Sequence, residues 1–293
     1  MKWEGNRQSD NVEDARGGGA AGGRGVRIGG RGLGLGTVVI ALLAGWAFGI
    51  NPLTVLSLLS GDGPLVTQQA PAPATAPPPG DRMAAFVSTV LADTEDVWRD
   101  QFRRMGTQYS EPKLRLFRGV EPTACGTGQA AMGPFYCPAD RKVYIDLSFY
   151  DQLARGMGAP GEFAQAYVIA HEVGHHVQNL MGITAQVDRL RGRASVAEQN
   201  EMSVRLELQA DCFAGVWAFH ANQQRRILEP GDVEAGLNAA AQIGDDTLQR
   251  KARGTVVPES FTHGTSRQRQ AWLRRGLQTG DVRECNTFGA KTL

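Results

Sequence analysis

Apolar residues recur with the period of an α-helix along most of the chain beyond residue 82. In the first such stretch, Phe86, Val90, Val97 and Phe102 recur at helical spacing and charged residues lie between the last three, as on a helix with one face against a core. The same pattern predicts helices over residues 83–105, 160–180, 195–223 and 231–250, and one more that begins after an N-cap at Ser266. Most of the folded domain should therefore be helical.

Two short stretches have the alternation of a β-strand instead. These are residues 109–117 and 142–147, and in the second Val143, Ile145 and Leu147 alternate with polar or aromatic residues. The glycine-rich segment 125–137 between them is predicted to be a loop. The fold class is therefore α+β, mainly α, with a small sheet. A strand at 143–147 could also border a cleft and pair with an extended substrate, or it could be plain sheet structure.

The beginning of the chain follows a different pattern from the rest. Residues 1–31 are polar and then glycine-rich, which predicts a disordered basic head. Residues 32–60 carry no charge and contain an apolar run long enough to begin a membrane span, so one transmembrane helix is predicted there. Residues 61–82, rich in proline and alanine, are expected to form an extended linker. The folded domain should then occupy residues 83–293.

The charges beside the apolar run predict how it would be oriented. Arginines precede the run and are absent just after it, which favours a cytoplasmic N-terminus and an exported domain at a bacterial inner membrane. A cleaved signal peptide ending near Ala70-Pro-Ala72 is the alternative, but the long charged leader and the length of the run argue against it. The net charge of +1 gives no reason to expect a nucleic-acid partner. The oligomeric state is left open.

The chain has 4 cysteines, an even number in a domain predicted to be exported. This favours two disulfides, and of the three possible pairings we expect Cys125 with Cys137 and Cys212 with Cys285. Buried free thiols are the alternative. A four-cysteine zinc site is disfavoured because no two of these cysteines have C-x-x-C spacing.

The chemistry centres on His171-Glu172-Val173-Gly174-His175, which lies inside one of the apolar helical stretches. Residues four apart project from the same face of a helix, so His171 and His175 can offer nitrogens to one Zn²⁺. Glu172 would lie beside the open position of the metal, where it can accept a proton from water. His176 points elsewhere on the helix and is expected to have a hydrogen-bonded or surface role instead. Gly174 should let another backbone approach.

A catalytic zinc ion needs a third protein ligand, and the best candidate lies on the next long helix. Glu207 and Asp211 share one face of that helix in an apolar environment where an unpaired carboxylate would be costly. Glu207 is predicted to bind the metal, and Asp211 to accept a hydrogen bond from a histidine ligand. Glu201, Asp211 and His220 are the alternative ligands.

Two further polar groups lie nearer the C-terminus. His263 is expected in the loop before the last helix, where it could stabilise an oxyanion or hydrogen-bond a zinc ligand. Asp245 and Asp246 could support the site, but local capping or pairing with Arg250 is the favoured interpretation.

Several motifs together resemble the bacterial neutral zinc metallopeptidases, a membrane group with a single anchor. The similarity runs through nearly the whole chain, in Arg7–Asp14, Cys125-Gly126, Gly133–Pro138, Val143–Asp146, His171–Gln178, Glu207–Gly215 and His263–Ser266. The resemblance implies a zincin-like fold and a gluzincin-type peptidase. It also implies one Zn²⁺ per chain held by His171, His175 and Glu207, with Glu172 as the base.

The sequence thus predicts a zinc endopeptidase that acts on polypeptides, anchored to the membrane by one N-terminal helix. Glu172 would activate water, and His263 would share in stabilising the oxyanion. Two alternatives remain. One is a non-catalytic, zinc-dependent module that binds extended or misfolded envelope proteins, and the other is a zinc amidase that cleaves cell-wall peptides.

Overall fold

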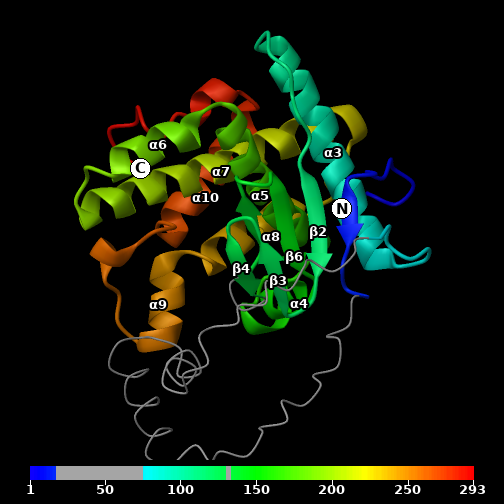
Figure 1. The fold of residues 1–293 in the computed structure, drawn as a ribbon, viewed down its shortest axis with the longest axis horizontal. Helices are drawn as coiled ribbons and strands as arrows, with labels where there is room; N and C mark the ends of the chain where they lie inside the picture. Colours follow the sequence, from blue (N-terminus) through cyan, green and yellow to red (C-terminus); the bar gives the residue numbers. More distant parts are fainter. Residues whose placement is uncertain (18–74, 130–132) are drawn as a thin grey trace, which may run out of the picture. The chain divides into compact units, whose positions relative to one another are not determined.

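A computed structural model describes residues 1–17, 75–129 and 133–293. Met1–Arg16 and Pro73–Leu293 form one folded unit, whose elements are labelled in Figure 1. The predicted transmembrane segment 32–60 lies outside the described residues, as does most of the predicted linker. No helix within the described ranges combines the length and the hydropathy of a membrane span.

A four-stranded sheet, in the order β1-β2-β6-β5, lies beside the helices. The first three strands are parallel, and β5 is antiparallel to β6. Two further strands form a separate antiparallel hairpin, β3-β4. The bounds are β1 (Val12–Asp14), β2 (Lys113–Phe117), β3 (Val120–Thr123), β4 (Gly126–Gln129), β5 (Phe135–Cys137) and β6 (Lys142–Asp146).

The sheet corrects two of the predictions. Segment 125–137 contains β4 and β5 and is not a simple loop, because Phe135 stacks on Tyr144 with ring centroids 4.9 Å apart and holds the short strand in register. The predicted strand at 142–147 is present as β6, but it lies inside the sheet between β2 and β5. Among the described strands, β5 is therefore the one with an unpaired edge on this side.

The helices dominate the fold, which confirms a mainly α domain with a small sheet. They are α3 (Arg82–Arg104), α4 (Ser148–Asp151), a π-helical turn η2 (Gln152–Gly156), α5 (Glu162–Leu180), α6 (Ile183–Arg191), α7 (Val196–Arg225), α8 (Asp232–Gln242), α9 (Asp245–Arg253) and α10 (Ser266–Thr279). The described part of the chain also contains two 3₁₀ turns, η3 (Pro258–Ser260) and η4 (Val282–Cys285).

Helix ends follow local capping chemistry. Ser195 caps α7 in a reciprocal pair with Glu198, as its position predicts. The cap of α10 is Thr265, paired with Gln268, and not Ser266. The Ser266 hydroxyl is already occupied, because it donates to the Ala241 carbonyl at 2.6 Å. The single helix predicted over 231–250 is divided at Gly244 into α8 and α9.

The prediction of a disordered head is wrong for residues 1–17. Val12–Asp14 forms β1, and Trp3 is only 5% exposed because its ring packs edge-on against Phe86 of α3. The prediction rested on the polar composition of this segment and did not take into account the few apolar side chains that it buries. Residues 18–31, the remainder of the predicted head, lie outside the described residues.

Helices α7 and α10 cross in close contact at two glycines. A Cβ atom on Gly276 would lie 2.0 Å from the Cys212 carbonyl oxygen, and one on Gly215 would lie 2.3 Å from that of Leu273. Both predicted disulfides are present, and Cys212–Cys285 ties α7 to η4 just after α10. This crossing fixes the position of α10 and of its side chains relative to α7.

A methyl group at the helix crossing should therefore be poorly tolerated. We expect Gly276→Ala to lower the free energy of unfolding by about 3 kcal/mol, since relief of the clash requires the helices to separate. Gly192→Ala is the matched control, because no atom lies within 4 Å of its Cβ position, and it should change stability by less than about 1 kcal/mol. Denaturant unfolding of both variants measures the difference; equal stabilities would contradict the role of this contact.

Candidate functional site

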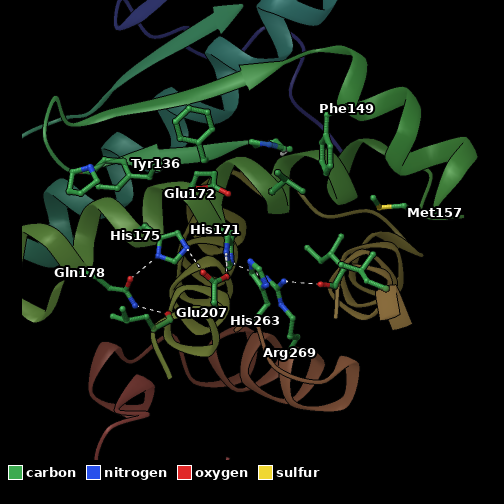
Figure 2. A pocket seen from close by; sticks show the side chains of 18 of the residues that line it. Tyr136, Phe149, Met157, His171, Glu172, His175, Gln178, Glu207, His263 and Arg269 are labelled. Carbon is green, nitrogen blue, oxygen red and sulfur yellow. Dashed lines mark hydrogen bonds and ion pairs between the residues drawn. The ribbon is translucent and has the colours of Figure 1, made fainter. Parts of the chain in front are cut away.

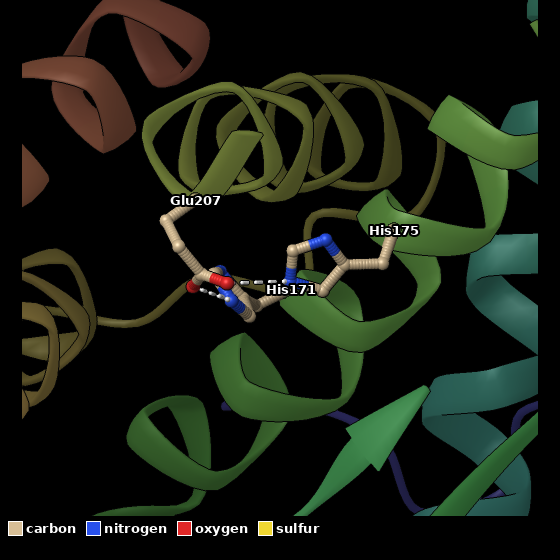
Figure 3. A group of neighbouring side chains, drawn as sticks. All are labelled: His171, His175 and Glu207. Carbon is tan, nitrogen blue, oxygen red and sulfur yellow. Dashed lines mark hydrogen bonds and ion pairs between the residues drawn. The ribbon is translucent and has the colours of Figure 1, made fainter. Parts of the chain in front are cut away.

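Helices α5 and α7 bring the three predicted metal ligands together. A Cβ atom on Gly174 would lie 3.0 Å from the Ala210 carbonyl oxygen, so this glycine permits the close approach that the sequence predicted. Nε2 of His171 lies 3.1 Å from one oxygen of Glu207, and Nε2 of His175 lies 3.3 Å from the other. Figure 3 shows the three side chains converging from the two helices.

The opposite nitrogen of each histidine is held by a hydrogen-bond acceptor. Nδ1 of His171 donates to Asp211 at 2.8 Å, and Nδ1 of His175 donates to the Gln178 side-chain oxygen at 2.8 Å. The orientation of Gln178 is fixed because its amide nitrogen donates to the Leu206 carbonyl. Nε2 of each imidazole is therefore directed towards Glu207, the orientation in which it could bind a metal ion in place of a proton.

These three residues could hold a metal ion, since one possible ligand atom from each lies within 4.8 Å of the others. Two neutral imidazoles and one carboxylate form the donor set typical of a catalytic Zn²⁺ site. The alternative ligands are engaged elsewhere: Asp211 contacts Nδ1 of His171, Glu201 pairs with Arg205, and His220 contacts the Gly280 carbonyl.

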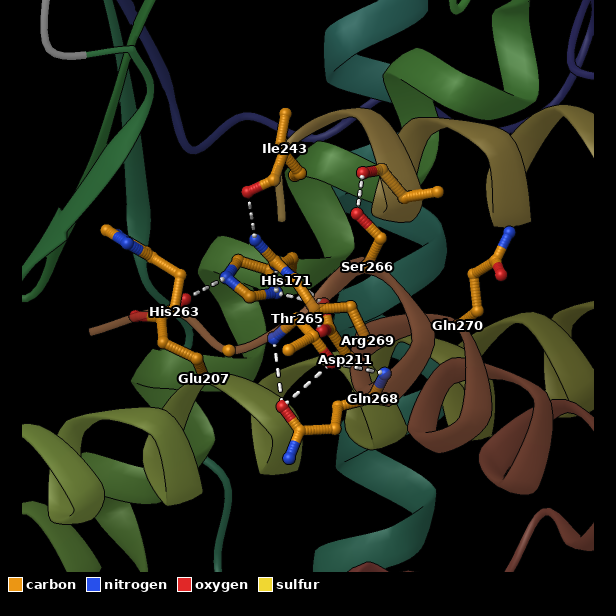
Figure 4. Close-up of polar contacts among 12 residues, drawn as sticks. His171, Glu207, Asp211, Ile243, His263, Thr265, Ser266, Gln268, Arg269 and Gln270 are labelled. Atoms are coloured by element: carbon orange, nitrogen blue, oxygen red, sulfur yellow. Dashed lines mark hydrogen bonds and ion pairs between the residues drawn. The ribbon is translucent and has the colours of Figure 1, made fainter. Parts of the chain in front are cut away.

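A buried ionic network lies behind His171. Both oxygens of Asp211 accept from Arg269 of α10, at 2.8 and 2.9 Å (Figure 4). One of these oxygens also accepts from Tyr167 at 2.5 Å. Asp211 is 0% exposed and Arg269 is 2% exposed. Burial alone would raise the pKa of Asp211, but the charges of Arg269 and His171 outweigh it and lower the pKa to about 2. Asp211 is therefore a fixed anion that orients the imidazole of His171.

His176 has a structural role, as its position on the helix predicted. Nε2 donates to the Ser110 carbonyl at 2.6 Å, so Nδ1 accepts from the Tyr136 hydroxyl at 2.9 Å. Burial lowers the pKa of His176 to about 4, which keeps the imidazole neutral. The same Tyr136 oxygen accepts from Asn179. Tyr136 lines the pocket, but its hydroxyl proton is already committed to His176.

The candidate ligands lie in a pocket of about 590 Å³ (Figure 2). Glu172 lines this pocket and is 7% exposed. Its carboxylate accepts no hydrogen bond from another described residue. Burial raises the pKa of Glu172 despite the nearby histidines. Its carboxylate is thus a base available to a molecule in the pocket. One wall is apolar and consists of Phe149, Met157, Val168, Ile243 and Leu248.

His263 also lines the pocket, held by Asp245 from the start of α9. Nδ1 of His263 lies 3.2 Å from one Asp245 oxygen, and the other oxygen accepts the backbone N–H groups of residues 262–264. The hydrogen bond to Asp245 raises the pKa of His263, although burial opposes it. Local capping or pairing with Arg250 was the favoured expectation, but Asp245 instead binds this loop and so supports a residue that lines the pocket.

Sequence reasoning missed two residues of this site. Gln178 follows His175 by three positions on α5, a spacing that could have suggested contact. Arg269 gives no such signal, because it reaches Asp211 only through the crossing of α10 over α7. Several other arginines on α10 are exposed, and the sequence does not distinguish the buried Arg269 from them.

Comparison with known proteins places the chain in a class of metallopeptidases. A sequence profile of the family described as "Putative neutral zinc metallopeptidase" matches residues 1–288, so the chain belongs to that family. "Uncharacterized protein YpfJ" of Escherichia coli K12 is 53% identical over 293 residues, which covers 99% of each chain. "Uncharacterized protein Rv2575" of Mycobacterium tuberculosis H37Rv is 44% identical over 197 residues, which covers 63% of this chain and 65% of the relative. No solved structure matches this chain.

Removal of the buried Arg269 charge should destabilise the domain strongly. Arg269→Met leaves the Asp211 carboxylate buried without its cation, and we expect the free energy of unfolding to fall by about 3–5 kcal/mol. Arg274 is exposed on the same helix, so Arg274→Met should change stability by less than about 0.5 kcal/mol. Denaturant unfolding compares the pair. A small effect at Arg269 would mean that the network does not support the site.

Proposed function

We propose that the protein is a zinc-dependent endopeptidase. The observation that carries this proposal is the convergence of His171, His175 and Glu207, with both histidines held in the metal-binding tautomer by Asp211 and Gln178. Membership of a zinc metallopeptidase family supports it independently. When bound, Zn²⁺ supplies Lewis acidity that makes water nucleophilic near neutral pH.

The residues of the chain divide the remaining chemistry between them. The Glu172 carboxylate accepts a proton from the attacking water and then gives it to the amine that leaves. A raised pKa suits this role, because the group must both take and release the proton. His263, whose pKa is raised by the hydrogen bond to Asp245, donates to the oxyanion that forms on the former carbonyl oxygen.

The pocket favours a polypeptide substrate. The outer edge of β5 carries no other described strand, and Phe135 and Tyr136 of this strand line the pocket. An extended peptide could pair with β5, which takes the place of segment 143–147 as the predicted substrate-binding strand. The apolar residues that line the pocket would accept a side chain of the substrate.

The two alternatives predict different results with the same purified protein. A non-catalytic module would hold zinc and bind unfolded proteins without cleaving any of them. An amidase would cleave purified cell-wall fragments and leave polypeptides intact. No observation in the pocket favours either alternative over peptide hydrolysis.

Two glutamates should separate metal binding from catalysis. We expect elemental analysis to find one equivalent of zinc in the parent protein and the loss of most of it in Glu207→Ala. Glu201→Ala is the matched control on the same helix and should retain the zinc, because Glu201 pairs with Arg205.

Glu172→Gln should retain zinc but hydrolyse an unfolded protein about 100-fold or more slowly than the parent, since the catalytic base is lost. Full activity of Glu172→Gln would exclude the assigned base, and full zinc content of Glu207→Ala would exclude the assigned ligand.

His263 should affect the rate more than substrate binding. Stabilisation of an oxyanion contributes only in the transition state, so His263→Gln should lower kcat about 100-fold with little change in KM or zinc content. Arg267→Gln removes an exposed positive charge nearby and should leave both constants unchanged. Steady-state kinetics on one peptide distinguish the variants. A rise in KM alone would instead assign His263 to substrate binding.

A further inference from the structure

The first residues of the chain are built into the same folded unit as the candidate site. β1 is paired with β2 in parallel, with Val12 opposite Leu114 and Asp14 opposite Leu116. Val12 is 6% exposed and Trp3 is 5% exposed. The guanidinium of Arg82 covers the Trp3 ring at 5.1 Å from its centroid. The segment therefore contributes to the core and is not an appended tail.

Polar contacts fix this segment to α3. Arg16 pairs with Asp14 at 2.6 Å and with Asp81, the N-cap residue of α3, at 2.7 Å. The backbone N–H of Ser9 donates to the Ser88 carbonyl, and the Ser88 hydroxyl donates back to the Ser9 carbonyl. Both serines are buried.

The sheet provides a third attachment. Glu13 of β1 pairs with Lys113 and Arg115 of β2 and with Lys142 of β6, at 3.3, 3.2 and 2.8 Å. Residues 1–16 are thus tied to α3, β2 and β6 by apolar, ionic and backbone contacts together.

The chain leaves this unit and returns to it at one place. Asp14 and Thr75 exchange two backbone hydrogen bonds, at 2.7 and 3.1 Å, in an antiparallel bridge. The segment between them contains the uncharged stretch 32–60 that the sequence marks as a membrane span. If that stretch crossed a bilayer once, residues 1–16 would lie on the opposite side from residues 75–293. A strand pair and a packed indole cannot form across about 30 Å of hydrocarbon.

We propose that residues 1–16 and residues 75–293 lie on the same side of the membrane. The segment between them then returns to the side that it left, and it crosses the bilayer an even number of times or not at all. This replaces the single-pass topology, with a cytoplasmic N-terminus and an exported domain, that the flanking charges suggest. The proposal rests on the packing of β1 and is independent of the proposed peptidase activity.

Labelling of single cysteines in the full-length protein tests the proposal directly. Gln8→Cys and Ala197→Cys introduce exposed thiols in the two parts, and the four native cysteines are in disulfides. A membrane-impermeant maleimide should label both variants equally in intact cells, or both only after permeabilisation. Labelling of one variant in intact cells and of the other only after permeabilisation would overturn the proposal.

A cross-link tests the contact that underlies it. Ser9→Cys combined with Ser88→Cys should form a disulfide inside intact cells treated with a permeant thiol oxidant, because these backbones are hydrogen-bonded to each other. Free thiols are blocked before lysis, and the chain is then cut at a protease site inserted between Gln68 and Gln69. On a non-reducing gel the two fragments should remain joined only in the double variant and separate on reduction. Separate fragments from a folded double variant would show that β1 is not docked in the cell, and would overturn the proposal as well.

Discussion

The close contact between α5 and α7 is the constraint on which the site depends. Gly174 lies between the two histidines on α5 and faces the Ala210 backbone of α7, so the helices approach without a side chain between them. At this separation a glutamate on α7 spans the gap to both imidazoles. A larger residue at 174 would move the carboxylate away from the two nitrogens together. Helix packing and ligand geometry are therefore one requirement here.

A network of buried charges around Asp211 supports the candidate metal ligands. Asp211 contacts His171, Tyr167 and Arg269, and all four side chains are removed from water. Such a network stabilises only when every member is satisfied, because an unpaired buried charge is costly. The domain thus uses α10, tied down by its own crossing with α7, to fix the tautomer of a histidine on α5. The stability of the domain and the orientation of His171 for metal binding therefore both depend on the Asp211 carboxylate.

Local patterns predicted much of this molecule. Helical periodicity located α3, α5 and α7, and four-residue spacings picked out His171, His175, Glu207 and Asp211. Arg269 was missed because it reaches the site only through a helix crossing. Support of the site by Asp245 was considered but not favoured, because it depends on a loop wrapped around the carboxylate. β1 was missed because pairing across a hundred residues overrode a polar, glycine-rich composition. Periodicity and spacing report what lies on one element, and not how elements meet.

The position of β1 also has a consequence for the order of folding. Its residues leave the ribosome long before the strand that they pair with, β2, which begins at Lys113. Val12 can pair only after Leu114 has been synthesised. Closing so long a loop costs conformational entropy before the strand pairs form and offset that cost. Ties to α3, which is completed earlier at Arg104, shorten that search by holding the segment nearby. β1 can thus be secured in the sheet only after both α3 and β2 have been synthesised.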